Sequence, residues 1–197
     1  ATIDRIEFNP ALQMYEVTVD SKILYLTKDL KYVILGQIID VSTPSKPVNL
    51  TAQKEQKLTQ EIIKTLDKST ALKVGNGPVE IIEIVSPDCP HCKHLAVHLK
   101  NKKELTRYIF FVPWNPAKVN YILCQKNHDK QLKAYEEVFY KNKQDVPQTA
   151  ACEFSKKQSE VVKSLRVQGV PMVFINGEVV QGANLDLIDS LIKGAKK

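Results

Sequence analysis

The chain contains very little arginine. Of its 28 basic residues, only Arg5, Arg107 and Arg166 are arginine, and the lysines are spread over the whole sequence. Surfaces that read bases or clamp phosphates favour arginine, because its guanidinium forms two parallel hydrogen bonds. The net charge of +6 therefore indicates a solvated, lysine-rich surface, and no nucleic-acid partner is expected.

Long apolar runs, internal repeats and low-complexity tracts are also missing. No run approaches the roughly 18 apolar residues of a membrane-spanning helix. The content of 43% hydrophobic and 25% charged residues is ordinary for a globular protein. No cleavable signal is present, yet the chain starts at Ala1 without a methionine, so we expect an exported protein whose signal peptide has been removed.

Cysteine is scarce, with four residues in 197: Cys89, Cys92, Cys124 and Cys152. An even number permits two disulfides, which would indicate an oxidising compartment. Four reduced cysteines would instead indicate the cytosol or a metal site.

The first 50 residues are predicted to form strands, at 12–19, 22–27 and 31–41. The candidate core residues of the first strand are Leu12, Met14, Val17 and Val19. After the breaker cluster at 42–47, apolar residues recur with helical spacing over 51–67. Thr51 is the expected N-cap, and the turn at 75–78 is the expected end. So little sheet needs a partner surface to bury a core.

The second part of the chain, from Val79 onward, alternates strands with helices. A buried strand is expected at 79–85, followed by a helix from Cys89 to about residue 102 and a second buried strand at 108–112. A polar helical block at 117–166, interrupted near Pro147, comes next. The chain is expected to end with a hairpin of strands 171–176 and 178–181 around Asn176-Gly177 and a helix at 185–195.

The pair in Cys89-Pro90-His91-Cys92 carries the chemistry. The spacing places both cysteines on the first turn of a helix, at a separation suited to a disulfide. Pro90 tolerates an early helical position, so Cys89 caps the helix, where the dipole stabilises its thiolate. His91 can donate to that thiolate or add positive charge. Cys89 is thus the predicted nucleophile and Cys92 the resolving thiol.

Two other interpretations of the pair were weighed. Cys89, Cys92, His94 and His98 could supply four zinc ligands, or the pair could form an inert disulfide. Structural zinc pairs normally sit on turns with a second paired set elsewhere. Cys124 and Cys152 do not form such a set, so redox chemistry is favoured.

The segment 79–92, followed by Gly169-Val170-Pro171, resembles a thioredoxin-fold oxidoreductase. In that fold a cis-proline loop lies beside the reactive pair, and Pro171 matches this proline. The resemblance implies that Val170 and Pro171 bind substrate, with their backbone pairing with polypeptide as a strand would. A simple strand start is the alternative for Pro171.

The N-terminal part narrows the resemblance. Residues 23–29, 31–36, Asp40 and 48–51 are similar to the dimerisation domain of DsbC and DsbG, the periplasmic disulfide isomerases of bacteria. The resemblance covers essentially the whole chain and also includes Gly177, Gly182 and the last helix. It implies an α+β or α/β chain, with a small β-rich dimerisation domain at 1–50, a linker helix at 51–68 and a thioredoxin-like catalytic domain at 69–197 with a helical insertion at about 117–166.

The same resemblance implies a V-shaped homodimer in the periplasm, whose two sites face a shared cleft. Misfolded or mis-oxidised exported proteins would be its substrates, and a membrane reductant of the DsbD type would re-reduce it. Cys124 and Cys152 match a structural disulfide in the insertion, with two buried free thiols as the alternative. No cofactor and no metal are expected.

Three departures from the isomerase pattern and one added residue bear on the function. Pro90-His91 replaces a Gly-Tyr type of dipeptide and Val170 replaces threonine, and both resemble the DsbA oxidases. Leu30 replaces a glycine in the strand turn. Glu83, six positions before Cys89, matches a buried acid of DsbA-like proteins that could shuttle the proton of Cys92, and a peripheral glutamate is the alternative.

The sequence leaves three candidate functions for this chain. A homodimeric protein disulfide isomerase is the leading hypothesis. A DsbA-like dithiol oxidase is the alternative within the same chemistry. A chaperone-like binding module for unfolded chains is the alternative from another class.

Overall fold

The computed structural model describes residues 3–19, 22–165, 167 and 169–195. The chain forms two compact units, Ala1–Lys64 and Thr65–Lys197. Each unit is described by itself. Arg166, the last residue of the predicted helical insertion, lies outside the described residues.

The first unit is a meander of antiparallel strands followed by a hairpin and a helix. Its elements are β1 (Ile3–Asn9), β2 (Met14–Val19), β3 (Lys22–Thr27), β4 (Val33–Ile34), β5 (Ile39–Asp40), β6 (Val48–Asn49) and α1 (Leu50–Lys64). The sheet runs in the order β1-β2-β3-β4, and β5 pairs with β6. The predicted strand at 31–41 is thus two short pieces, and β1 precedes the first strand that the pattern indicated.

The turn between β3 and β4 explains how leucine replaces glycine there. The Thr27 hydroxyl donates to Asp29 Oδ1 at 2.6 Å, and the Leu30 amide donates to the Thr27 carbonyl at 2.8 Å. Leu30 adopts a φ of +60°, in the left-handed region that favours glycine. The hydrogen bonds hold this backbone in place.

Side chains of α1 tie the helix to the sheet. Thr51 is buried, and its hydroxyl lies 2.5 Å from the Tyr25 hydroxyl and accepts from the Ile38 amide at 2.8 Å. The prediction that Thr51 caps the helix is therefore wrong. Asn49 takes this place, since its Oδ1 accepts from the Ala52 amide at 2.9 Å.

The small core of the first unit differs from the predicted one. Of the four candidates on the first strand only Val17 is buried, and Leu12, Met14 and Val19 are half-buried. The buried neighbours of Val17 on β2 are polar, namely Glu16 and Thr18. Lys54 on α1 pairs with Glu16, so a carboxylate and an ammonium occupy part of the contact between the helix and the sheet.

The second unit contains a five-stranded sheet in the order β11-β10-β8-β9-β7. The strands are β7 (Leu72–Val74), β8 (Val79–Val85), β9 (Leu105–Phe111), β10 (Met172–Ile175) and β11 (Glu178–Gln181). β8 and β9 are parallel, and the other pairs are antiparallel. The short helix η1 (Lys68–Thr70) and β7 separate α1 from the turn at 75–78, so that turn does not end the helix as predicted.

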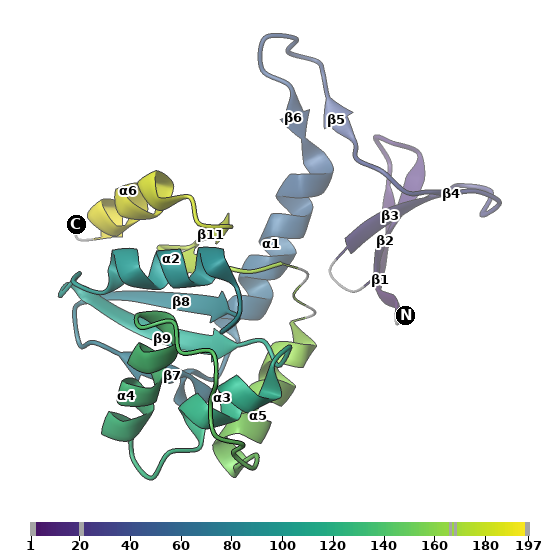
Figure 1. Cartoon of the computed structure of the whole chain (residues 1–197). Helices are drawn as coiled ribbons and strands as arrows, with labels where there is room; N and C mark the ends of the chain where they lie inside the picture. Colours follow the sequence, from purple (N-terminus) through teal and green to yellow (C-terminus); the bar gives the residue numbers. More distant parts are fainter. Residues whose placement is uncertain (1–2, 20–21, 166, 168, 196–197) are drawn as a thin grey trace. The chain divides into compact units, whose positions relative to one another are not determined.

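Helices cover both faces of this sheet. The helices are α2 (Pro90–Leu99), α3 (Pro116–Leu123), α4 (His128–Phe139), α5 (Glu153–Ser164) and α6 (Leu185–Ala195). Figure 1 shows α2 and α6 on one face, with α5 on the other. One buried cluster includes Ile109, Phe111 and Val138, and a second includes Ile81, Val173 and Ile188, with α2 contributing to both.

The predicted helical block is three helices and a long coil. The chain from residue 143 to residue 152 has no helix or strand, and Pro147 lies within it. The hairpin around Asn176-Gly177 is present, with φ values of +50° and +82° at its two turn residues. Within the described residues no helix is long and apolar enough to cross a membrane.

Candidate functional site

The sheet brings two distant segments to one edge. Val85 ends β8, and the antiparallel pairing of Met172 with Ile84 places the start of β10 beside that end. Cys89 follows β8, and Pro171 directly precedes β10. Residues that are about 80 positions apart in the sequence therefore meet at the same edge, as the Cys89–Val170 contact, with a sequence separation of 81, demonstrates.

Cys89 caps α2, as its sequence position predicts. Its Sγ accepts from the Cys92 amide at 3.3 Å, and Pro90 occupies the first helical turn. The half-buried Cys89 thiol also donates to the Val170 carbonyl at 3.6 Å. The Val170–Pro171 peptide bond is cis, in agreement with the thioredoxin-like loop that the sequence indicated.

Cys92 lies one turn deeper and is 0% exposed. Burial raises the pKa of the Cys92 thiol, and its hydrogen bond with Cys89 and the charge of Glu83 add to this, while a backbone hydrogen bond from Ser86 opposes it. The Ser86 amide donates to Cys92 Sγ at 3.5 Å. The two free thiols thus differ in access, because one faces the surface and the other is enclosed.

His91 is exposed on the first turn of α2. The zinc interpretation required His94 and His98 to gather with the two cysteines. In the described part of the chain no three histidine, cysteine, aspartate or glutamate residues are arranged to hold a metal ion. His98 instead lies 2.8 Å from Asp189 on α6.

Glu83 is buried, as expected for the acid on β8, with 1% exposure. Its two oxygens accept from Arg107 Nε at 2.5 Å and Arg107 Nη2 at 2.8 Å. Arg107 Nη2 also donates to the Tyr135 hydroxyl at 3.0 Å. Burial alone would lower the pKa of Arg107, but the charges of Glu83 and Tyr135 and the hydrogen bonds to Glu83 together outweigh it and raise that pKa. Arg107 therefore occupies one hydrogen-bonding position on each Glu83 oxygen.

Arg107 is a site residue that was not predicted from the sequence. A signal was available, because Arg107 stands in the apolar strand Leu105–Phe111 in a chain with only two other arginines. A charge within a buried strand requires a partner of opposite charge. Glu83, the acid in the neighbouring buried strand, could have been inferred as that partner.

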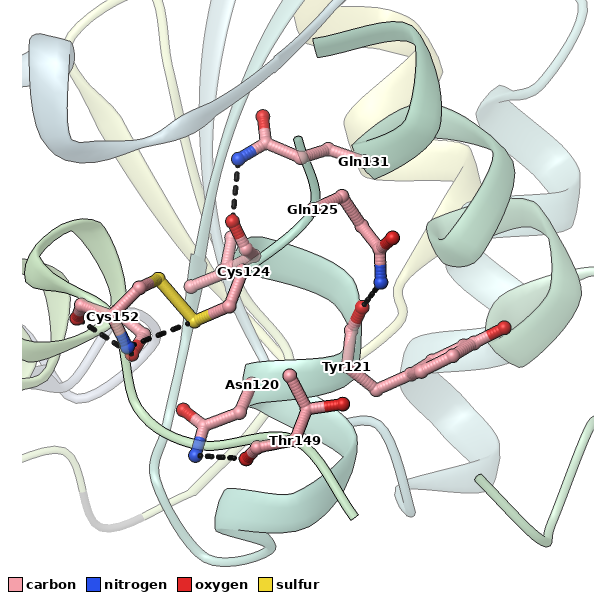
Figure 2. The surroundings of a disulfide bond; sticks show 9 residues. Asn120, Tyr121, Cys124, Gln125, Gln131, Thr149 and Cys152 are labelled. Carbon is pink, nitrogen blue, oxygen red and sulfur yellow. Dashed lines mark hydrogen bonds between the residues drawn. A yellow bond between two sulfur atoms is a disulfide. The ribbon is translucent and has the colours of Figure 1, made fainter. Parts of the chain in front are cut away.

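Cys124 and Cys152 form a disulfide with a Cα–Cα distance of 5.5 Å (Figure 2). Figure 2 also shows Asn120 Nδ2 donating to the Thr149 carbonyl, at 3.3 Å. The Cys152 amide donates to Cys124 Sγ at 3.1 Å. These contacts attach the coil before α5 to α3 and keep this pair separate from the two free thiols.

A helix capped by one cysteine of a CxxC pair, beside a cis-proline loop at the edge of such a sheet, defines a thioredoxin-fold protein with a dithiol site. Residues 53–185 match the thioredoxin-like domain family, and the chain belongs to that family. Residues 1–52 match the disulfide bond isomerase protein N-terminal domain.

Distant relatives share the name of a probable thiol:disulfide interchange protein. The probable thiol:disulfide interchange protein DsbC of Bordetella avium is 27% identical over 168 residues, which are 82% of this chain and 58% of the relative. The protein of the same name from Bordetella pertussis is 26% identical over 178 residues, 86% of this chain and 61% of the relative. The chain thus spans less than two thirds of the length of either relative.

Solved structures share the fold. A disulfide interchange protein from Neisseria gonorrhoeae superposes with a TM-score of 0.55 at 22% identity, covering 67% of this chain and 99% of that one. The thiol-disulfide exchange protein α-DsbA2 from Wolbachia pipientis gives 0.53 at 15% identity, covering 70% and 96%. At these identities the match concerns the fold alone.

Proposed function

We propose that this protein is a thiol:disulfide interchange enzyme that reshuffles wrong disulfides in other proteins through Cys89 and Cys92. The observation that carries the proposal is the unequal access of the two thiols. Cys89 is half-buried at the helix N-cap, and Cys92 is enclosed behind it. A substrate disulfide can reach Cys89 first, and Cys92 can then act only within the protein.

The exchange proceeds by successive thiolate displacements. The Cys89 thiolate attacks one sulfur of a substrate disulfide, a mixed disulfide forms, and the other substrate sulfur leaves as a thiolate. If that thiolate attacks a different disulfide of the substrate, and a substrate thiolate finally releases Cys89, the substrate is isomerised without net electron transfer. If Cys92 loses its proton and attacks Cys89 instead, the substrate leaves reduced by two electrons and the Cys89–Cys92 pair becomes a disulfide.

Three further residues are proposed to support these steps. Val170 and Pro171 would bind the substrate backbone beside Cys89, since the Val170 carbonyl already lies 3.6 Å from Cys89 Sγ. Glu83 would receive the proton of Cys92 or act on that thiol through its charge. Glu83→Gln should slow exchange at neutral pH, and a rate equal to that of the unaltered protein would leave Glu83 a structural role.

A homodimer is proposed from the surface of the first unit. Its exposed apolar side chains include Ile6, Val33 and Leu35, the last at 80% exposure. The edge strands β1 and β4 offer unpaired backbone groups. A second copy of residues 1–50 would cover both the edges and the apolar surface. The linker helix, predicted at 51–68 and observed as α1 at Leu50–Lys64, would hold two catalytic domains around a common cleft.

Sedimentation of the full chain tests the homodimer. Leu35→Lys should weaken association by at least about tenfold, because it places a charge in the proposed interface. Val97→Lys is the matched control, because Val97 is an exposed apolar residue of the second unit. A monomeric unaltered chain, or equal weakening by the two variants, would contradict this interface.

A dithiol oxidase is the second candidate, and Pro90-His91 together with Val170 favours it by resemblance. Its test is the equilibrium of the Cys89–Cys92 pair with glutathione. A potential near about −120 mV would support the oxidase, whereas a more reducing value would support the isomerase. As an exported periplasmic protein, the isomerase would need a reductant of the DsbD type to keep the pair reduced.

Alanine at both Cys89 and Cys92 tests the enzymatic proposal as a whole. The variant should lose the refolding of scrambled disulfide-bonded substrates. Suppression of aggregation is measured alongside. If the variant refolds scrambled substrate as well as the unaltered protein, the chemistry proposed here is wrong, and retained suppression of aggregation would then make a chaperone-like binding module the better interpretation.

A further inference from the structure

A buried lysine holds the residue that precedes the nucleophile. Lys118 on α3 is only 5% exposed, and its Nζ lies 2.5 Å from Asp88 Oδ1. Asn115, the N-cap of α3, donates to the other oxygen, Asp88 Oδ2, at 2.7 Å. Asp88 directly precedes Cys89. Burying an ammonium is costly unless it is paired and hydrogen-bonded, so this lysine is fixed by its partners.

The contacts of Lys118 continue to the other end of the active-site turn. Its Nζ also donates to Gln144 Oε1 at 3.0 Å. Gln144 Nε2 donates to Asn142 Oδ1 at 2.7 Å, and Lys93 Nζ donates to the same oxygen at 2.6 Å. Lys93 directly follows Cys92. These five residues, Asp88, Lys118, Gln144, Asn142 and Lys93, form a polar bridge from one end of the cysteine pair to the other.

The bridge contains two positive charges and one negative charge beside Cys89. Burial would raise the pKa of Asp88, but hydrogen bonds from Lys118 and Asn115 and the charge of Lys118 lower it overall. Burial lowers the pKa of Lys93, and the charge of Lys118 lowers it further, whereas Asp88 and the Cys89 thiolate oppose this. The Lys93 amide donates to the Cys89 carbonyl at 3.1 Å, so the two residues occupy adjacent turns.

We propose that Lys118 is a positioning residue that holds the Asp88 carboxylate in a neutral pair, so that the positive charge of Lys93 is the uncompensated charge beside the Cys89 thiolate. Asp88 directly precedes Cys89 in the chain, so an unpaired carboxylate there would add a negative charge that disfavours the thiolate. Lys118 prevents this through its ion pair with Asp88.

The other ionisable groups near Cys89 and Cys92 keep their contacts when Lys118 is replaced. His91 and Lys93 lie on the same helix as the cysteines. Glu83 on β8 is already paired with Arg107 on β9. The cis-proline loop presents the Val170 carbonyl. Removing Lys118 leaves the charges of these groups as they were. Only Asp88 changes, because it loses the ammonium with which it forms an ion pair.

The test measures the alkylation rate of Cys89 with iodoacetamide against pH, in the full chain with Cys92→Ala so that one free thiol remains. Lys118→Met should lower the rate at pH 7 by about two- to threefold and move the midpoint of the pH profile upward, as expected for one unpaired charge at this range in water. Lys143→Met is the matched control, because Lys143 pairs with Glu137 near the bridge and does not contact Asp88. It should leave the profile unchanged.

The double variant Asp88→Asn with Lys118→Met separates electrostatics from tethering. It lacks the same tether as Lys118→Met but has no free carboxylate, so its profile should return to that of the parent. If the double variant behaves like Lys118→Met, or if Lys118→Met leaves the profile unaltered, the proposal is overturned. If Lys118→Met fails to fold, Asp88→Asn alone tests the proposal. This variant leaves Lys118 as an extra positive charge, so the midpoint of the pH profile should move downward. An unchanged midpoint would overturn the proposal.

The inference rests on the proposed function only in taking Cys89 as the attacking thiol. Alkylation reads that thiol without any disulfide substrate. A protein that shows these shifts but does not refold scrambled substrates would contradict the proposed function alone, and a refolding enzyme without these shifts would contradict the role of Lys118 alone.

Discussion

The two units of the chain keep their apolar side chains in different places. The second unit encloses two clusters, built around residues such as Phe111 and Val173, whose exposed fractions are 0%. The first unit buries only a few apolar side chains of its sheet, such as Val17 and Tyr25, and exposes others such as Tyr32 and Leu35. A unit that leaves so much apolar surface in water is expected to need a partner, whereas the second unit has a complete core of its own.

The proposed dimer contacts and the proposed reactive thiols lie in different units. The cysteines and the cis-proline loop belong to the second unit, together with the buried Glu83–Arg107 pair. The first unit contains no cysteine. Its removal should therefore change association and leave the local reactivity of the thiols intact.

The largest expected effect comes from removing the first unit. A chain beginning at Thr65 should sediment as a monomer, because the exposed apolar strands are absent, and should keep dithiol oxidation. It should lose most of its isomerase activity, because a shared cleft would no longer form. Sedimentation and a scrambled-substrate refolding assay measure both. If the shortened chain isomerises as well as the whole protein, the shared-cleft mechanism fails and a simple oxidase becomes the better interpretation.

Breaking the buried ion pair of the second unit should have the next largest effect. Arg107→Met leaves Glu83 as a buried carboxylate without its partner, which should cost about 3–5 kcal/mol in the free energy of unfolding. The matched control is Lys22→Met in the first unit, where Lys22 pairs with Glu55 at 3.3 Å with its side chain 56% exposed. That change should cost less than about 1 kcal/mol. Denaturant unfolding compares them, and similar losses would contradict the contrast between the two units.

The disulfide should rank next. Cys124 and Cys152 are separated by 28 positions, so replacing both with serine should lower the free energy of unfolding by about 3–4 kcal/mol in the chain-entropy model. The loss should be confined to the second unit. In strong reductant the unaltered protein should lose the same stability, and a difference that persists there would show that the serines act through packing instead.

The site was predictable where its signals are local. The CxxC spacing, an early proline and a preceding apolar strand lie within 14 consecutive residues, 79–92, and they predicted the cap and the two roles of the cysteines. The pairing of Cys124 with Cys152 and the cis bond before Pro171 followed from resemblance to a known family. The hairpin at Asn176-Gly177 followed from turn chemistry alone.

The remaining features depend on partners far away in the sequence. Thr51 was expected to cap its helix, but its hydroxyl is hydrogen-bonded to the hydroxyl of Tyr25, 26 positions away. Lys118 reads as one of many lysines, and only tertiary packing brings it to Asp88, 30 positions away. Local propensity cannot predict such contacts, because they depend on which elements pack together.

The burial of Cys92 leads to the smallest predicted effect, which concerns pH. Burial disfavours the thiolate and raises the pKa of the Cys92 thiol in the folded, reduced protein. An unfolded cysteine ionises near pH 8.5. Below that pH both states keep the proton, and the contribution of this group to stability is constant. Above it the unfolded state loses its proton first, so the free energy of unfolding falls as pH rises.

The expected slope is about 1.4 kcal/mol per pH unit above about pH 8.5 for the one proton concerned. The measurement is the difference in free energy of unfolding between the reduced parent and Cys92→Ala, taken at several pH values, because other groups titrate equally in both proteins. The same raised pKa should make closure of the Cys89–Cys92 disulfide speed up with pH by about tenfold per unit through the neutral range, since the thiolate fraction of Cys92 rises by that factor. Two results would contradict this prediction: a difference in unfolding free energy that stays constant up to pH 10, or a rate of disulfide closure that levels off near pH 7. Either would mean that Cys92 ionises in the folded protein as easily as a free thiol does. The two cysteines would then differ in access but not in acidity.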